Sequence, residues 1–453
     1  MTKAVNEREL VLGILLEITK NGEHEHIILR NTLSKYQYLE KRERAFITRV
    51  VEGTLEHMIE IDYIINQFSK VKVNKMKPVI RTIIRSAVYQ ILYMDSVPNS
   101  AVCNEAVKLA AKRGFVNLKG FVNGVLRNID RNVSNIQYPG RENMLEYMSI
   151  KYSMPMWILE KWQKSYDLET MEKMLQGFLE EKGTTIRCNL HRISKEELIQ
   201  KLREEQVTVK EHPYLDYALE ISGYDYLGDL ESFEDGDFQV QDLSSMLVAE
   251  VAEPKEGDSV IDVCAAPGGK SLHIADKLRG TGHVEARDLT DYKVELIWDN
   301  IERAQVENME AVKQDALVFD EASEEKAEIV IADLPCSGLG VIGKKADIKY
   351  NMTEPLQEEL EKLQREILSV VHRYVKPGGT LVYSTCTINE GENIENVRWF
   401  LSQYPEFEQV SVESVLCDAL KGSVKDGCLQ LLPGIHESDG FFIAKFHKKE
   451  KGV

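Results

Sequence analysis

The apolar positions of residues 1–130 recur at the spacing of one face of a helix. Two stretches show this most clearly, each with apolar residues three or four positions apart: Leu10, Val11, Ile14, Leu15 and Ile18, then Val79, Ile80, Ile83, Ile84, Val88 and Leu92. Pro98-Asn99-Ser100 interrupts the pattern, which resumes at 104–107 and 121–127. The pattern therefore predicts an all-helical domain over residues 1–138.

The pattern changes twice more along the chain. Helical periodicity at 156–182 and 194–205 flanks a short extended run at 185–190, which predicts a small α/β connector domain from 139 to 240. From 241 to 453, short apolar runs alternate with amphipathic helices, which is typical of a Rossmann-like α/β domain with a mostly parallel sheet. Seven strands are predicted, the last two as a hairpin: 259–264, 283–287, 310–313, 328–333, 379–385, 427–432 and 440–446.

Composition restricts the class of protein. The 453 residues are 43% hydrophobic and 29% charged, as in soluble multidomain proteins. No run reaches the roughly 20 apolar residues of a membrane span, and residues 1–30 lack the features of a signal peptide. Seven scattered Cys without a C-x-x-C pair predict neither a disulfide framework nor a zinc site. We expect a cytoplasmic protein with reduced thiols and no bound metal.

Charge is distributed unevenly along the chain. Residues 1–140 carry 21 Lys and Arg against 14 Asp and Glu, whereas the remainder carries 35 against 60. Several basic residues gather just before and along the helix predicted at 79–92: Lys70, Lys72, Lys75, Lys77, Arg81 and Arg85. A basic N-terminal part on an acidic body is expected of a protein that binds nucleic acid, although a basic helix face is more often only solvated surface.

A Gly-rich turn follows the first strand of the α/β domain. Its residues are Cys264, Ala265, Ala266, Pro267, Gly268, Gly269 and Lys270, and a helix is predicted to begin near Ser271. Small residues let a ligand approach the backbone, and the helix N-terminus offers free N–H groups. The turn is therefore a candidate nucleotide site.

Two kinds of nucleotide site compete for this turn. A P-loop is favoured by Gly269-Lys270-Ser271, but its pattern requires Gly at the position of Cys264. A site for an adenosine cofactor requires an acid about 20 residues on, after the next strand. Asp288 lies 19 residues beyond Gly269, and Asp315 follows the third strand, where an adenine edge would lie. We therefore expect an adenosine cofactor. A second glycine pattern, at 338–343, follows the fourth strand and is interpreted as a flexible loop over the site.

Two cysteines follow the fourth and fifth predicted strands. Asp333-Leu334-Pro335-Cys336 ends the fourth strand, and Tyr383-Ser384-Thr385-Cys386 ends the fifth. Ligands of open parallel sheets bind outside the carboxyl ends of the strands, so both thiols are predicted at the functional edge. A single Cys is usually a small buried apolar residue. Two at adjacent strand ends, one of them after Asp-x-Pro, favour nucleophilic chemistry.

At these residues the sequence resembles the RNA cytosine-C5 methyltransferases of the NOL1/NOP2/Sun type, and within them the RsmB (Sun, Fmu) subfamily. The resemblance covers nearly the whole chain, including a NusB-like RNA-binding domain at its N-terminus. The matching segments stand in the family's order: Gln241-Asp242-Leu243-Ser244-Ser245, 264–270, 333–340, 384–387 and 433–442. The chain departs from the family's pattern at Leu334, at 343–346 and within 389–393.

The resemblance implies methyl transfer from S-adenosylmethionine to C5 of a cytosine in 16S rRNA, at cytosine 967. It implies that Cys386 adds to C6 of the base, that Cys336 assists elimination and release, and that Asp333 lies by cytosine N3 or the methionine end of the cofactor. It implies further cofactor contacts by the turn 264–270, by Asp288 at the ribose and by Asp315 at the adenine. The rRNA would present an unpaired or flipped nucleotide to a protein expected to be a monomer.

Two other functions stay open at the level of sequence. A non-catalytic RNA-binding or antitermination-type factor with a degenerate methyltransferase domain would account for the basic N-terminal part, but it would not need a cysteine pair. An RNA-dependent ATPase would account for Gly269-Lys270-Ser271, but not for Cys264.

Overall fold

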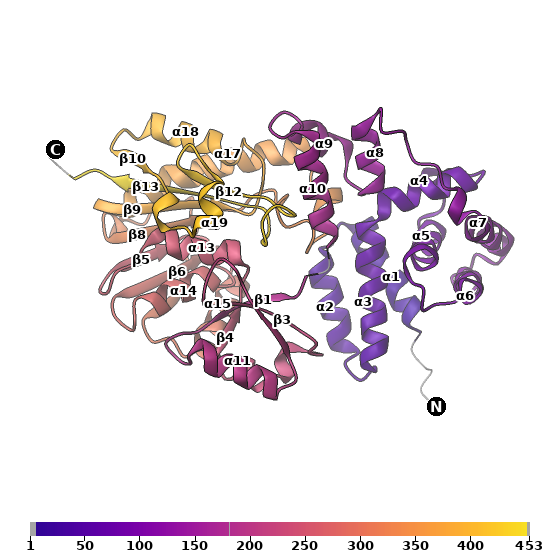
Figure 1. Cartoon of the computed structure of the whole chain (residues 1–453), viewed down its shortest axis with the longest axis horizontal. Coiled ribbons are helices and arrows are strands. Elements are labelled where there is room, and N and C mark those ends of the chain that lie inside the picture. Colours follow the sequence, from indigo (N-terminus) through magenta and orange to yellow (C-terminus); the bar gives the residue numbers. More distant parts are fainter. Residues whose placement is uncertain (1–5, 181, 451–453) are drawn as a thin grey trace. The chain divides into compact units, whose positions relative to one another are not determined.

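The computed structural model describes residues 6–180 and 182–450 (Figure 1). Their contacts divide the chain into two compact units. The first contains the described residues up to Glu180 together with Ile342–Met352, and the second contains the described residues of Glu181–Val341 and Thr353–Val453. A segment from the C-terminal half of the chain therefore belongs to the N-terminal unit.

The first unit is built from helices, as its apolar periodicity predicts. The helices are α1 (Glu7–Asn21), α2 (Glu25–Lys35), α3 (Lys41–Glu56), α4 (Met58–Phe68), α5 (Pro78–Tyr93), α6 (Asn99–Lys112), α7 (Lys119–Arg131), α8 (Met144–Lys151), α9 (Met156–Trp162) and α10 (Leu168–Leu179). The two predicted apolar stripes lie on α1 and α5, which pack on each other and on α3. Pro98 separates α5 from α6, because proline cannot continue a helix.

The segment 342–352 completes this unit. Its short helix α16 (Ile348–Asn351) lies beside the end of α3, and Ala346 joins the helical core. Lys349 Nζ donates to the carbonyl of Glu56 at 2.7 Å, and the Tyr350 hydroxyl donates to the carbonyl of Leu55 at 2.6 Å. The last carbonyls of a helix have no partner within it, so these side chains satisfy the end of α3. The apolar pattern gave no sign of this placement.

The second unit begins with a small antiparallel sheet. Its strands are β1 (Thr184–Cys188), β2 (Thr208–Glu211), β3 (Ala218–Ser222) and β4 (Phe238–Val240), in the order β2-β3-β1-β4. The helices α11 (Lys195–Glu204) and α12 (Glu231–Glu234) accompany them. Ile186, Leu198, Leu219 and Phe238 are fully buried in its core. This sheet confirms an α/β connector, although the helices α8 to α10, which the predicted range of 139 to 240 included, belong to the first unit.

A larger, mostly parallel sheet follows. Its parallel part has the order β9-β8-β5-β6-β7, formed by β5 (Ser259–Asp262), β6 (His283–Asp288), β7 (Met309–Lys313), β8 (Ala327–Asp333) and β9 (Val375–Thr385). Antiparallel β13 (Phe441–Lys448) extends it beside β9, followed by β12 (Cys428–Leu431) and β11 (Val424–Lys425), while β10 (Phe407–Val410) also pairs with β13. The Rossmann-like prediction is confirmed. In the described residues the sheet has nine strands rather than seven. β10 was missed because its two apolar residues are separated by Glu408 and Gln409, and β11 because it spans only two residues.

Helices cover both faces of this sheet. Alternate strand residues point to opposite faces, so Val260 and Ile331 pack in one core and Ile261 and Val330 in the other. The first core includes α13 (Leu243–Ala252), α14 (Gly269–Lys277) and α15 (Asp291–Ala304), and the second includes α17 (Glu354–Val371) and α18 (Ile394–Gln403). The short α19 (Asp418–Lys421) lies beside the first core. The five parallel strands therefore all end at one edge of the sheet, where ligands of such folds bind.

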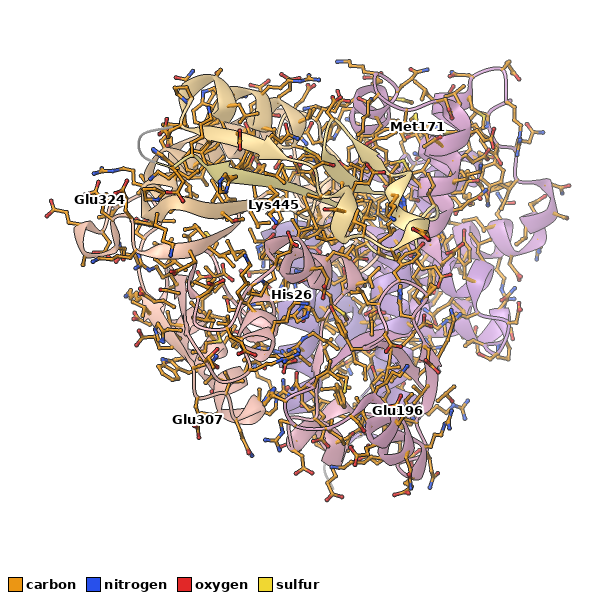
Figure 2. All side chains as sticks on the ribbon, turned by 60° about the vertical axis from the view of Figure 1, so that its left-hand side comes forward. His26, Met171, Glu196, Glu307, Glu324 and Lys445 are labelled. Atoms are coloured by element: carbon orange, nitrogen blue, oxygen red, sulfur yellow. The ribbon has the colours of Figure 1, made fainter. Side chains whose placement is uncertain are left out.

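Charged side chains stand out from the surface of the second unit. Glu196, Glu307 and Glu324 point outward in Figure 2, as expected for the acidic part of the chain. In the described part of the chain, no helix combines the length and the apolar character that crossing a membrane requires.

Glu60 is a buried carboxyl group at the centre of the first unit. It accepts hydrogen bonds from the hydroxyls of Tyr93 and Tyr138, and it lies 3.2 Å from Lys151 Nζ and 3.3 Å from His57. Burial by itself raises the pKa of Glu60, but these partners outweigh it and lower the pKa to about 2. The ionised side chain therefore stabilises the unit that surrounds it.

We expect Glu60→Gln to lower the free energy of unfolding of the full chain by about 3 kcal/mol at pH 7, because a buried charged network loses its centre. The contribution of Glu60 is complete above its unfolded pKa of 4.5 and is lost as the pH falls through about 2. The difference between variant and wild type in urea unfolding should therefore shrink as the pH is lowered from 5 to 3.

Glu23→Gln, an exposed change of the same charge in the same unit, serves as the control and should stay within about 0.5 kcal/mol. Equal effects of the two substitutions would contradict a specific role of Glu60.

Candidate active site

The Gly-rich turn joins the end of β5 to the start of α14. Gly268 adopts φ 102°, a left-handed conformation that side chains disfavour, and α14 begins at Gly269. Beneath the turn, the fully buried Asp262 accepts a hydrogen bond from Ser271 Oγ at 2.6 Å and a longer one from the Cys264 amide. Burial raises the pKa of Asp262 to about 7. The sequence analysis did not single out this residue, although it ends the strand before the turn.

The two predicted acids lie at the ends of the next two strands. Asp288 ends β6 and accepts a hydrogen bond from the Ala266 amide at 3.0 Å, so it is tied directly to the turn. Asp315 follows β7, where its carboxyl accepts from the Leu317 amide. Burial, followed by the charges of Asp262, Asp288 and Asp333, raises the pKa of the Cys264 thiol. An edge with this many carboxyl groups favours a cationic ligand.

Asp333 at the end of β8 is held between two other segments. Lys270 Nζ of the turn lies 2.7 Å from one carboxyl oxygen, and Ser384 Oγ donates to the other at 2.7 Å. Burial by itself lowers the pKa of Lys270, but Asp333 outweighs it and raises that pKa. Both oxygens of Asp333 are acceptors in this arrangement. The turn, β8 and β9 thus meet at one ion pair.

The predicted cysteines come together. Cys336 Sγ and Cys386 Sγ are 3.2 Å apart, and both thiols are free and partly exposed. The hydrogen bond to Cys386, followed by burial, raises the pKa of the Cys336 thiol well above its ordinary value. The protonated form of Cys336 is therefore favoured, and either sulfur can be the donor of the pair. Cys103, Cys188 and Cys428 are buried in the cores instead.

In the glycine-rich segment 338–343, Gly340 is held by two backbone hydrogen bonds. The Gly340 amide donates to the carbonyl of Cys386 at 3.0 Å, and the Gly440 amide donates to the carbonyl of Gly340 at 2.9 Å. The interpretation of 338–343 as a flexible loop is therefore wrong for Gly340, which lies between the Cys386 segment and the loop before β13. Glycine is required there because the backbones approach too closely for a side chain.

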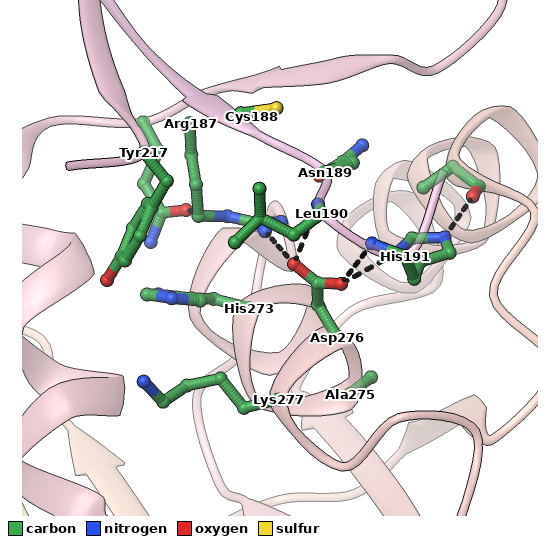
Figure 3. Close-up of polar contacts among 12 residues, drawn as sticks. Arg187, Cys188, Asn189, Leu190, His191, Tyr217, His273, Ala275, Asp276 and Lys277 are labelled. Atoms are coloured by element: carbon green, nitrogen blue, oxygen red, sulfur yellow. Dashed lines mark hydrogen bonds and ion pairs between the residues drawn. The ribbon is translucent and has the colours of Figure 1, made fainter. Parts of the chain in front are cut away.

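Residues at the end of strand β1 in the connector sheet form hydrogen bonds with α14 (Figure 3). Arg187 of β1, almost fully buried, donates to Asp276 of α14 at 2.9 Å and to Gln241 Oε1 at 3.0 Å. The backbone N–H of His191 donates to the other oxygen of Asp276, and its ring lies within 2.8 Å of it. Gln241 in turn packs on Gly269, the first residue of α14. Gln241 was predicted only as part of the segment that leads into the last domain. The signal for Arg187 was a charged residue placed between the apolar Ile186 and Cys188.

The residues gathered at this edge fit a cationic adenosine ligand and a nucleophilic thiol. In the ranges 6–180 and 182–450, no three His, Cys, Asp or Glu side chains are placed to hold a metal ion. Two thiols, an ion pair and the Gly-rich turn thus occupy the carboxyl ends of β5, β8 and β9.

Three families match successive parts of the chain. Residues 5–131 match the NusB family, 154–224 match the RsmF/B-like ferredoxin-like domain, and 249–447 match the family described as 16S rRNA methyltransferase RsmB/F. The probable ribosomal RNA small subunit methyltransferase B of Bacillus subtilis is 34% identical over 99% of this chain and all of its own length. The corresponding protein of Synechocystis sp. is 30% identical over 98% of this chain and all of its own length.

Solved structures are also similar. The crystal structure of PH0851 covers 99% of this chain and all of its own, with a TM-score of 0.82 and 27% identity. NSun6 from Pyrococcus horikoshii, crystallised with SFG, an analogue of S-adenosylmethionine, covers 64% of this chain and 97% of its own, with a TM-score of 0.57 and 25% identity.

Gly340→Ala should destabilise the second unit by about 1–3 kcal/mol, as overpacking does. A Cβ at this position would lie 1.9 Å from the Gly440 carbonyl oxygen and 2.8 Å from that of Cys386, and backbone atoms cannot turn away as a side chain can. Urea unfolding measures the loss. Gly422→Ala, where no atom lies within 4 Å of the added Cβ, is the matched control and should be close to neutral. A neutral Gly340→Ala would refute the close approach.

Proposed function

Because the chain belongs to the RsmB/F family of 16S rRNA methyltransferases, we propose that it methylates C5 of a cytosine in 16S rRNA, cytosine 967 by resemblance. The family uses S-adenosylmethionine as the methyl donor. The observation that carries the C5 assignment is the pair of thiols 3.2 Å apart beside the Gly-rich turn. Methylation of an oxygen or of an exocyclic nitrogen needs no such pair, since those atoms are nucleophiles already.

The residues present at the turn fit S-adenosylmethionine. The turn 264–270 would hold its methionine part, Asp288 the ribose hydroxyls and Asp315 the adenine. Asp262, Asp288 and Asp333 lie near enough to Cys264 to raise the pKa of its thiol, and two of the three are paired with Lys293 and Lys270. This surplus of carboxyl groups suits a sulfonium cation better than a triphosphate. When bound, the cofactor supplies an electrophilic methyl group.

Cys386 carries the covalent step in this proposal. Cytosine C5 is a poor nucleophile, and addition of the Cys386 sulfur to C6 makes C5 electron-rich enough to take the methyl group. C5 then loses its proton, the bond between sulfur and C6 breaks, and the methylated base leaves. The raised pKa of Cys336 supports Cys386 as the attacking group, because Cys336 keeps its proton. Cys336 assists the later elimination, and Asp333 lies by cytosine N3 or the methionine end of the cofactor.

The helical domain would supply RNA affinity. The target base must be unpaired or flipped to reach C6, so the rest of the RNA must be held elsewhere. Lys70, Lys72, Lys75 and Lys77 are all exposed between α4 and α5 and can contact phosphates. We assign RNA binding to 1–138, connection to 139–240 and catalysis to 241–453, in a monomer that acts in the cytoplasm.

Two measurements test this function together. S-adenosylhomocysteine should raise the melting temperature of the purified protein, whereas ATP with magnesium should not, because a ligand that binds only the native state stabilises it. Bisulfite mapping of 16S rRNA after incubation with protein and S-adenosylmethionine should show one new protected cytosine. Protection at no cytosine, or stabilisation by ATP, would overturn the proposal.

The two cysteines should give opposite results in an adduct assay. Cys336→Ala should still attack, methylate and then stall, so a covalent protein–RNA complex accumulates and migrates slowly on a denaturing gel. Cys386→Ala should form no complex and transfer no methyl group, while its affinity for S-adenosylmethionine stays near normal. The double variant controls for nonspecific cross-linking and should show no band. A band from Cys386→Ala would reverse the two roles.

Replacing Lys70, Lys72, Lys75 and Lys77 together by Gln should weaken RNA binding and flatten its salt dependence. Each lost phosphate contact reduces the slope of log affinity against log salt by about 0.7–0.9. Filter binding at several salt concentrations measures the slope. The control replaces four exposed lysines of the second unit: Lys255, Lys326, Lys425 and Lys449. If both quadruple variants change the slope equally, the N-terminal lysines have no special role.

A further inference from the structure

A buried carboxyl group lies behind the two cysteines. Glu392, between β9 and α18, has no exposed surface. One of its oxygens accepts from the Ser337 amide at 2.8 Å and from Gln364 Nε2 at 3.1 Å. The other accepts from Ser337 Oγ at 2.5 Å, from Asn389 Nδ2 at 3.1 Å and from Gln357 Nε2 at 3.3 Å. Five donors thus converge on one side chain.

These donors come from three separate segments. Ser337 follows Cys336 directly, Gln357 and Gln364 lie on α17, and Asn389 lies three residues after Cys386. Ser337 Oγ also lies 2.8 Å from Thr387 Oγ1, so the residues that follow the two cysteines are hydrogen-bonded to each other. Glu392 therefore joins the Cys336 segment to the Cys386 segment and anchors both on α17.

The bonds around this centre hold the same two segments. Gln364 Nε2 also donates to the carbonyl of Pro335 at 2.8 Å, directly before Cys336. On the other side, Asn393 Nδ2 donates to the carbonyl of Thr387 at 3.0 Å, directly after Cys386. Each cysteine thus has a hydrogen-bonded neighbour in a network whose centre is Glu392.

We propose that Glu392 is the positioning residue that holds Cys336 against Cys386, so that elimination follows attack on the base. Its side-chain hydrogen bonds go to Ser337, Gln357, Gln364 and Asn389 and not to the Gly-rich turn, so it acts through Ser337. The inference rests on the proposed function, because it assigns to one buried side chain the geometry that the second half of that reaction needs. Attack by Cys386 requires only that cysteine, whereas release requires both sulfurs at the same base.

A carboxylate near Cys336 favours the protonated thiol. The pKa of the Cys336 thiol is raised first by the hydrogen bond to Cys386, then by burial, and further by Glu392. The other groups that face Cys336 are Cys386 and the buried phenol of Tyr383. Glu392 therefore helps to keep Cys336 protonated and unable to replace Cys386 as the nucleophile.

The test compares Glu392→Gln with Cys336→Ala in the adduct assay on 16S rRNA. Gln keeps one acceptor oxygen but replaces the other by an NH2 group, which cannot accept from the donors that bond to that oxygen of Glu392. Part of the link between the two cysteine segments is therefore lost. We expect kcat to fall at least tenfold, the dissociation constant for S-adenosylhomocysteine to stay within twofold, and the covalent protein–RNA complex to accumulate as it does in Cys336→Ala. A role confined to folding would lower adduct formation and turnover together.

Glu395→Gln is the matched control. It removes the same charge three residues further on, where the exposed Glu395 forms an ion pair with Arg398, and it should turn over at the wild-type rate. Ser337→Ala provides a second variant should Glu392→Gln fail to fold. It leaves the carboxyl group in place, removes the hydroxyl shared with Thr387, and should accumulate the complex to a smaller extent.

The outcomes distinguish a failure of the positioning role of Glu392 from a failure of the proposed function. If Cys336→Ala accumulates the complex but Glu392→Gln and Ser337→Ala do not, the positioning role is overturned and the proposed function stands. If Cys336→Ala itself forms no complex, the covalent mechanism fails, and the inference fails with it.

Discussion

The site depends on the alignment of two neighbouring parallel strands. Asp333 of β8 and Ser384 of β9 are register partners, and a hydrogen bond joins their side chains. Since both strands end at this level, the residues that follow them leave the sheet side by side. The sulfurs of Cys336 and Cys386 can then lie 3.2 Å apart although 50 residues separate them. A shift of one residue in this register would turn one of the two segments toward the opposite face.

The rest of the second unit supports that alignment. The turn after β5 contributes Lys270, which pairs with Asp333, and Gly340 brings the Cys336 segment within hydrogen-bond distance of the Cys386 carbonyl. Behind these segments, the donors around Glu392 replace the water that its buried carboxyl group would otherwise require. On the far side of the turn, Arg187 ties the connector sheet to α14. The two cysteines at the strand ends are therefore held in place by residues that are not nucleophiles themselves.

The helical unit follows a different physical rule. Its stability comes from apolar stripes on α1, α3 and α5, which local spacing already encodes. Two features go beyond that spacing. Glu60 is buried because two tyrosines, a histidine and a lysine surround it, and the segment 342–352 satisfies the carbonyl end of α3. Each depends on residues distant in sequence.

The sequence alone predicted the helical unit, the α/β character of the connector, the positions of the large strands along the chain, the Gly-rich turn and the two cysteines at strand ends. Those features arise from local periodicity, from Gly-rich turns and from the rule that parallel strands present their carboxyl ends on one edge. Tertiary structure alone decided the 3.2 Å sulfur distance, the place of Gly340, the convergence on Glu392 and the membership of 342–352 in the helical unit. These rest on hydrogen bonds between segments far apart in the chain. A buried Glu or Arg has the same letter as a solvated one, and only the fold shows which donors and acceptors surround it.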